Sequence, residues 1–443
     1  MKETSVKYPF LTQDVKIYEQ DNGHKIVLAY KEGGMVNVSS WVKTGSINEN
    51  DQNNGISHFL EHLMFKGTHK HPAGEFDHIL EAKGAIVNAA TWKDYTFYYV
   101  TLPKGENDEN FNLAIELHAD MMTDPVIPDY EMGAPFDIND QNVTDKRERH
   151  VVIEEIRMRK DQPWTKVYNA TNHAMYKEHP YKRDVIGTPE IISQVSQEEI
   201  MNYYKTFYSP QNVTTIIVGE FDFDKVLEKV KKEFNWGDRP TPPERSILPD
   251  KPVQKTVYIE NESNINSSFM MFGYLGVPAK DLKNFIALEM LAIILGEGTS
   301  SRLYVNLVEN MDEQIFNMID SENYSFRDGS NFFVQANFNP EYKDKAIDLV
   351  KVEIEKLKEN ISEQELNKAK KKLKSRFACE VETVSEIGES IGYYMTVCDD
   401  LALAEEYIPI CESITTEDLK AVANKYLNIN NAVISVLSPR QNT

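Results

Sequence analysis

The sequence of 443 residues is poor in cysteine, has no long apolar run and carries far fewer basic than acidic residues. Its three cysteines show no spacing typical of metal ligands, so we expect reduced structural thiols in a cytoplasmic protein. The net charge of −22 argues against nucleic acid or an anionic membrane as partner. No run is long enough to span a bilayer, and the first residues lack the apolar core of a signal peptide.

Histidine is absent from the second half of the chain. All ten histidines lie at or before His179. A metal site that uses imidazole ligands must therefore come from the first half alone.

The stretch GISHFLEHLMFKGT, residues 55–68, predicts a helix over 55–66. An apolar stripe with helical spacing supports this prediction: Ile56, Phe59, Leu60, Leu63 and Met64. His58 and His62 then lie one turn apart on one face, with Glu61 beside them. Two imidazoles at this spacing can hold one zinc ion, and the order His-x-x-Glu-His is the inverzincin signature. The alternative is a pair of partly buried histidines satisfied by hydrogen bonds.

A catalytic zinc site needs a third protein ligand, and KRERHVVIEEIRMRKD, residues 146–161, offers candidates. Glu148 and Glu155 share one face of a helix there, whereas Glu154 points away from Glu148. We therefore predict Glu155 as the ligand and Glu148 as a supporting group that holds a water or an imidazole N–H. On this segment alone, a solvated face of charge pairs explains the pattern equally well. We expect surface or structural roles for His69, His71, His78, His118, His150, His173 and His179.

The two halves of the chain are related. Residues 237–254, rich in proline and charge, read as a linker between domains 1–236 and 255–443. HFLEHLMFKGTHK from His58 can be laid on EMLAIILGEGTSS from Glu289, where His58 meets Glu289 and His62 meets Ile293. We therefore predict an internal duplication whose second copy binds no metal, and an insertion in the first copy at residues 131–147.

The pattern of elements predicts an α+β fold with two homologous domains. Each domain should be a largely antiparallel sheet covered by helices on one face. We expect helices at 55–66, 75–83, 109–123, 146–160, 197–207, 281–295, 341–358 and 363–379. Strand-like runs include HKIVLAY, MVNVSSWVKTG, FYYVTL, VTTIIVG, KTVYIE, SFMMFGYLG, NFFVQANF and AVISVLS.

Several motifs together resemble the pitrilysin and insulinase superfamily, in its half-length branch with the mitochondrial processing peptidase beta subunit and bacterial processing peptidases. They are GISHFLEHLMFKGT, AKGAIVNAATWKDYTFYY, ERHVVIEEI with DQPW, HPYKRDVIGTPEII, FYSPQNVTTIIVG and ILGEGTSSRLY. The resemblance covers nearly the whole chain.

The resemblance implies one Zn²⁺ per chain, bound by His58, His62 and Glu155, with Glu61 as the catalytic base and Glu148 as a second acidic residue of the site. GAIVNAAT, residues 84–91, reads as an edge strand, and its Asn88 and Ala89 would contact an extended peptide substrate by strand addition. The expected function is a zinc endopeptidase that cleaves unfolded peptides or leader segments inside a two-subunit chamber. The alternative is a catalytically silent peptide-binding or scaffold subunit, against which the intact histidine motif argues.

The chain departs from the family pattern in its second half. The family often carries an arginine and a tyrosine seven positions apart that bind the reacting carbonyl. Counting from SSRLY, these places hold Val308 and Ile315. We therefore expect a heterodimer in which a homologous subunit supplies Arg and Tyr, and we favour it over a homodimer. The 93 positions from His62 to Glu155 are also more than the family usually shows, as the insertion at 131–147 would explain.

Overall fold

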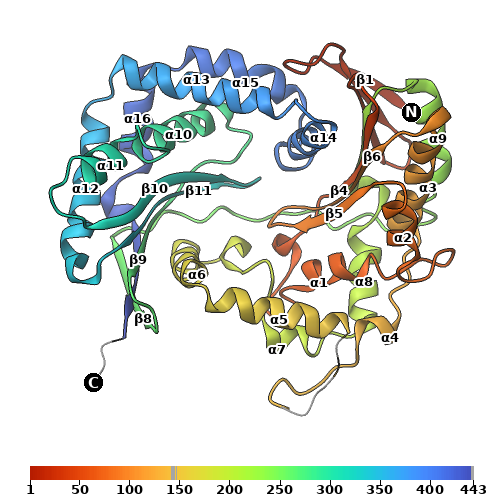
Figure 1. The fold of residues 1–443 in the computed structure, drawn as a ribbon, viewed down its shortest axis with the longest axis horizontal. Coiled ribbons are helices and arrows are strands. Elements are labelled where there is room, and N and C mark those ends of the chain that lie inside the picture. Colours follow the sequence, from red (N-terminus) through yellow and green to blue (C-terminus); the bar gives the residue numbers. More distant parts are fainter. Residues whose placement is uncertain (141–144, 146, 441–443) are drawn as a thin grey trace. The chain divides into compact units, whose positions relative to one another are not determined.

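A computed structural model describes residues 1–140, 145 and 147–440. Runs of alternating and β-branched residues form a first, seven-stranded sheet in the order β1-β2-β3-β7-β4-β6-β5 (Figure 1). Every neighbouring pair is antiparallel except β3 with β7. The strands are β1 (Lys2–Val6), β2 (Val15–Glu19), β3 (Lys25–Tyr30), β4 (Met35–Val42), β5 (Ile86–Thr91), β6 (Thr96–Pro103) and β7 (Val213–Gly219).

Helices from the first half of the chain pack on this sheet and on one another. They are α1 (Ile56–Leu63), α2 (Glu75–Glu81), α3 (Glu109–Thr123), α4 (Asp129–Met132), α5 (Glu148–Asp161), α7 (Pro189–Ile192), α8 (Gln197–Phe207) and α9 (Phe223–Glu233). The predicted helices at 55–66, 75–83, 109–123, 146–160 and 197–207 all form, with ends shifted by up to three residues. Short strands β1 and β2 were not predicted. The β1 sequence is almost wholly exposed and polar, and β2 has five residues, of which Val15 and Tyr18 are buried.

The second sheet has five strands in the order β10-β11-β9-β12-β8, with β8 and β12 parallel and the other pairs antiparallel. These strands are β8 (Val257–Ser263), β9 (Ser268–Leu275), β10 (Phe316–Ser325), β11 (Ser330–Phe338) and β12 (Val433–Pro439). The later helices are α10 (Leu282–Leu295), α11 (Arg302–Tyr304), α12 (Lys343–Glu359), α13 (Glu363–Cys379), α14 (Val384–Tyr393), α15 (Ala402–Ser413) and α16 (Thr416–Tyr426).

The strand orders support the internal duplication. Read from the parallel pair, β3-β7-β4-β6-β5 corresponds to β8-β12-β9-β11-β10, and the first sheet adds β1 and β2. In chain order α1 then corresponds to α10 and α8 to α16. The α+β fold with two related, largely antiparallel sheets is therefore confirmed.

The two compact units exchange helices between the halves of the sequence. One unit comprises Met1–Arg157, Arg183–Ser246 and Ala378–Glu405, and the other comprises Met158–Lys182, Ile247–Phe377 and Glu406–Thr443. As a result α14 packs against β4 and β7, and α6 (Pro163–Met175) packs against β9 and β12. The division into sequence domains 1–236 and 255–443 stays a prediction, because the compact units partition the chain differently.

This exchange corrects the expectation that helices cover one face of each sheet. On β4, Val36 and Val38 belong to the core shared with α1 and α3. The other face of β4 lies against α14, where a Cβ on Gly392 would be 2.0 Å from the Trp41 ring and one on Gly388 would be 2.6 Å from the Asn37 oxygen. Glycine is required there because the helix lies so close to the strand.

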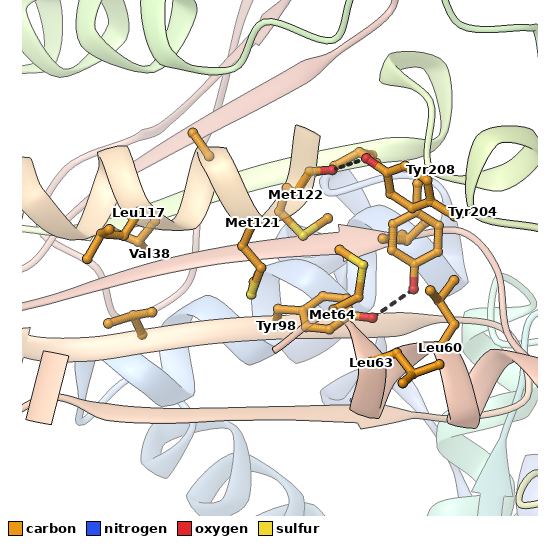
Figure 2. Packing of buried hydrophobic residues seen from close by; sticks show 14 of the residues in the cluster. Val38, Leu60, Leu63, Met64, Tyr98, Leu117, Met121, Met122, Tyr204 and Tyr208 are labelled. Atoms are coloured by element: carbon orange, nitrogen blue, oxygen red, sulfur yellow. Dashed lines mark hydrogen bonds between the residues drawn. The ribbon is translucent and has the colours of Figure 1, made fainter. Parts of the chain in front are cut away.

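The main core of the first unit lies between the sheet and its own helices. Figure 2 shows Leu60 and Leu63 of α1 and the adjoining Met64 packed with Tyr98 of β6 and with residues of α3 and α8. The buried tyrosines satisfy their hydroxyls internally: Tyr98 and Tyr208 share a hydrogen bond of 2.8 Å, and Tyr204 donates to the Met122 carbonyl at 2.9 Å. This packing fixes one face of α1 and leaves its other face for polar residues.

Part of the predicted insertion lies outside the described residues, namely 141–144 and 146. Within its described part, Phe136 stacks on His150 with ring centroids 4.3 Å apart. Among the described residues, no helix is long and apolar enough to cross a membrane. The three cysteines are free thiols, with Cys379 exposed and Cys398 and Cys411 buried.

Candidate metal centre

The first turn of α1 is held by a buried carboxylate. Gly55 is the N-cap residue of the helix and has a φ of 98°, a conformation that glycine adopts easily. Glycine has no side chain that could accept a hydrogen bond from the first amides of the helix. Instead Glu49 accepts hydrogen bonds from the backbone N–H groups of Gly55 (2.8 Å) and Ser57 (2.9 Å). Glu49 also accepts from the side chains of Ser57 and Asn54. These bonds satisfy amides that a helix start leaves without partners and fix α1 in place.

Because the apolar stripe of α1 faces the core, His58 and His62 lie together on the opposite side. Their ring centroids are 4.8 Å apart. The carboxylate of Glu155 on α5 reaches both rings, with its Oε2 3.8 Å from His58 Nε2 and 3.6 Å from His62 Nε2. The structure therefore brings the three predicted ligands together from two helices.

The donor set fits zinc. One potential ligand atom from each of His58, His62 and Glu155 lies within 4.8 Å of the others, and this is the one such group of three found among the described residues. Zinc bonds of about 2.0–2.1 Å place tetrahedral ligand atoms roughly 3.4 Å apart, close to the distances observed here. Two imidazoles and one carboxylate leave a fourth position for water or substrate.

Glu148 supports His62 from the side opposite the metal position. Its Oε1 lies 2.8 Å from His62 Nδ1, and Lys66 contacts its other oxygen at 2.5 Å. Burial alone would raise the pKa of Glu148, but the hydrogen bonds from His62 and Lys66 outweigh burial and lower it. Burial likewise disfavours charge on His62, yet the hydrogen bonds to Glu148 and Glu155 raise its pKa to about 9. A carboxylate on Nδ1 orients the ring so that Nε2 faces the metal position.

Glu154, the neighbour of Glu155 in the sequence, lies away from this site. Glu154 is exposed and pairs with Arg157 at 2.6 Å on the outer side of α5. The structure thus places Glu155, and not Glu154, beside the histidines. Glu61 is nearly buried and accepts a hydrogen bond of 2.6 Å from Thr91, the last residue of β5.

Strand β5 forms one edge of the first sheet, since β6 is its one neighbour in the strand order. Asn88 is exposed on this strand and Ala89 is half-buried. The Asn88 side chain accepts a hydrogen bond from the Ala89 N–H at 2.9 Å. Both residues therefore lie on the edge strand whose far end contacts Glu61.

The two positions at which the family often carries an arginine and a tyrosine hold apolar residues here. Val308 is half-buried in a π-helical turn, Val305–Glu309, and Ile315 is buried just before β10. Neither side chain carries a hydrogen-bond donor.

Comparisons with known proteins identify the family of this chain. The model of the family described as Insulinase (Peptidase family M16) matches residues 25–189, and that of the Peptidase M16 inactive domain matches residues 194–373. The Helicobacter pylori protein named zinc protease PqqE is 30% identical over 427 residues, covering 94% of this chain and 91% of the relative. The chain belongs to peptidase family M16.

Two further proteins match this chain across most of their length. The probable mitochondrial-processing peptidase subunit beta of Arabidopsis thaliana is 24% identical, covering 91% of this chain and 74% of that protein. The crystal structure of a protease from Helicobacter pylori superposes with a TM-score of 0.83 at 28% identity, covering 99% of both chains. The second M16 model, for an inactive domain, falls largely on the half that has no histidines.

Sequence reasoning missed three residues that build this site. Glu49 caps α1 from six positions before Gly55, outside the usual capping spacing, and Thr91 was read as an ordinary strand residue. Arg149 looked like part of a solvated face, but it is fully buried. The one signal for Arg149 was its place between the two acidic residues of a helix that must pack closely on α1.

Proposed function

We propose that this chain is a zinc-dependent endopeptidase that cleaves unfolded peptides or leader segments. The observation that carries the proposal is the convergence of His58, His62 and Glu155 beside the nearly buried Glu61. Membership of peptidase family M16 and the relatives named zinc protease support it.

In this proposal His58, His62 and Glu155 hold one zinc ion, and Glu148 fixes the orientation of the His62 ring. Zinc, when bound, lowers the pKa of a water ligand to about 7 and polarises a peptide carbonyl. The Glu61 carboxylate accepts the proton of the attacking water and returns it to the leaving amine. Asn88 and Ala89 on β5 align an extended substrate by strand addition, which uses the backbone of the edge strand.

The proposal also assigns the chain to a heterodimer. Val308 and Ile315 cannot donate hydrogen bonds to a developing oxyanion. A second copy of this chain would offer the same two apolar side chains. We therefore propose that a homologous subunit provides the arginine and tyrosine that this chain lacks. A cytoplasmic location is proposed from the cysteine usage alone.

Zinc content tests the ligand assignment. We expect His58→Ala, His62→Ala and Glu155→Ala each to reduce bound zinc sharply, because two protein ligands hold the ion weakly. Glu154→Ala is the matched control and should keep one zinc per chain, measured by metal analysis after dialysis. Loss of zinc from Glu154→Ala, with zinc retained by Glu155→Ala, would refute the assignment.

Hydrolysis tests the role of Glu61. Glu61→Gln should keep zinc and lose cleavage of a quenched fluorescent peptide, because the amide cannot accept the proton. Turnover near the wild-type rate in this variant would remove Glu61 from the mechanism. Zinc binding without chelator-sensitive hydrolysis by the wild-type chain, with and without a homologous subunit, would favour the silent subunit instead.

A further inference from the structure

In the hydrogen bond between Thr91 and Glu61, Thr91 is the donor. An ionised carboxylate can accept hydrogen bonds but cannot donate one, so the Thr91 hydroxyl must donate to Glu61 Oε2 across the 2.6 Å between them. The Thr91 hydroxyl also lies 3.4 Å from the Thr96 hydroxyl, and in that contact Thr96 is the donor and Thr91 the acceptor. Thr96 has its own better acceptor, the Thr44 carbonyl at 3.0 Å. The hydroxyl proton of Thr91 is therefore committed to Glu61.

Both partners are shielded from water, which strengthens this bond. Thr91 and Glu61 are each 9% exposed. A hydrogen bond to a charged group in such surroundings is stronger than one in water, and it restricts how the carboxylate can rotate. With Oε2 held by Thr91, the other carboxylate oxygen has a defined direction.

The backbone around Thr91 is fixed from several sides. Thr91 pairs with Thr96 across β5 and β6, and the turn between them closes with a hydrogen bond of 2.8 Å from Trp92 N to the Tyr95 carbonyl. The turn carbonyls of Trp92 and Lys93 accept backbone hydrogen bonds from residues 46 and 47. A Cβ on Gly45 would be 2.1 Å from the Trp92 oxygen, so this neighbouring segment lies in close contact with the turn. Thr91 is thus a rigid support.

We propose that Thr91 is a positioning residue for the proton-transferring carboxylate of Glu61. It also links that carboxylate to the strand bearing Asn88 and Ala89, so the peptide-binding strand and the base share one rigid element. This inference rests on the proposed function, because Glu61 needs an orientation only if it transfers a proton. The hydroxyl of Thr91 touches neither the substrate nor the reacting atoms in this role.

Two substitutions separate the hydroxyl from the shape of the side chain. Thr91→Val keeps the volume and removes the hydroxyl, whereas Thr91→Ser keeps the hydroxyl. Thr101→Val is the matched control, since Thr101 is 7% exposed on the adjacent strand and its hydroxyl contacts Asn37 instead of Glu61. All three variants should keep one zinc per chain.

The first readout is structural and needs no activity. In crystal structures of the zinc-loaded variants, the Glu61 carboxylate should keep its place in Thr91→Ser and lose it in Thr91→Val. An unmoved Glu61 in Thr91→Val overturns the proposal, whether or not the protein cleaves peptides.

The second readout is kinetic, with a quenched fluorescent peptide. Loss of one hydrogen bond to a charged group corresponds to a decrease in rate of about 10- to 100-fold. We expect this decrease in kcat, while KM stays near the wild-type value. Thr91→Ser should recover most of kcat, and Thr101→Val should match the wild type. If Thr91→Val has the kcat of the wild type, the positioning role of Thr91 is overturned and the proposed function is not affected. If the wild-type chain fails to hydrolyse the peptide even with a homologous subunit present, the result counts against the proposed function.

Discussion

Arg149, in the first turn of α5, contacts three carbonyls and a ring of α1. Its guanidinium is fully buried and donates to the carbonyls of Gly133 (3.0 Å), Ile192 and Val195 (2.7 Å). It also lies over the Phe59 ring of α1, 5.4 Å from the centroid. Burial lowers its pKa to about 10, so it stays charged at neutral pH. A planar fork with five donors suits three carbonyls, which a lysine could not satisfy together.

Replacing Arg149 should therefore destabilise the protein strongly. Arg149→Met leaves three carbonyls without their donor, and we expect a loss of about 3–5 kcal/mol in the free energy of unfolding. Arg157→Met on the exposed side of the same helix should change it by about 0.5 kcal/mol or less. Denaturant unfolding of both variants measures the difference, and equal midpoints would show that Arg149 does not anchor α5.

At the scale of elements, a chain of polar side chains crosses the core of the first unit. His24 contacts Thr215 of β7 at 2.9 Å, Thr215 contacts Ser40 of β4 at 3.3 Å, and Ser40 contacts His118 of α3 at 3.0 Å. Both histidines are fully buried, and burial lowers the pKa of each from 6.5 to about 3. They therefore remain uncharged in the folded protein at neutral pH.

The two buried histidines lead us to expect that the folded protein loses stability in mild acid. In the unfolded protein both histidines take up protons near pH 6.5, whereas in the folded protein they do so near pH 3. Their contribution is complete above pH 6.5 and is lost as the pH falls towards 3. Between pH 6.5 and 4.5 each should remove about 2–3 kcal/mol from the free energy of unfolding.

The measurement is denaturant unfolding across this pH range, on protein from which zinc has been removed with a chelator. His118→Gln can keep a hydrogen bond to Ser40. Unfolding of this variant should take up about one proton fewer, so its free energy of unfolding should depend less on pH. A pH dependence identical to the wild type would mean that His118 is not a buried neutral group in solution.

Across the whole molecule, the chain combines a half that carries the candidate metal ligands with a related half that lacks them. Glu289 of α10, aligned with His58, pairs with Arg376 at 3.1 Å instead of facing a second ligand. The second half also lacks donors at Val308 and Ile315. In the proposed function, a homologous subunit supplies these donors, which is the basis of the proposed heterodimer.

Reconstitution tests this arrangement. The purified chain should bind zinc and cleave a quenched fluorescent peptide weakly, because lost oxyanion donors reduce rates by about 10²–10³. Adding a homologous subunit that carries the Arg/Tyr pair should raise the rate by that order, and substituting its arginine or tyrosine should abolish the gain. Full zinc-dependent activity of the isolated chain, unchanged by any such homologue, would contradict the heterodimer.

The α+β fold class, the long helices and the candidate ligands could be predicted from the sequence, because they depend on periodicity within single segments. Helical spacing puts His58 and His62 on one face and separates Glu155 from Glu154 whatever the rest of the chain does. Three contacts followed from the tertiary structure alone: the cap that Glu49 provides, the bond from Thr91 to Glu61 and the packing of α14 on the first sheet. The Glu49 cap depends on how the loop before α1 folds back on the helix. The other two depend on where packing of the core places segments that are far apart in sequence.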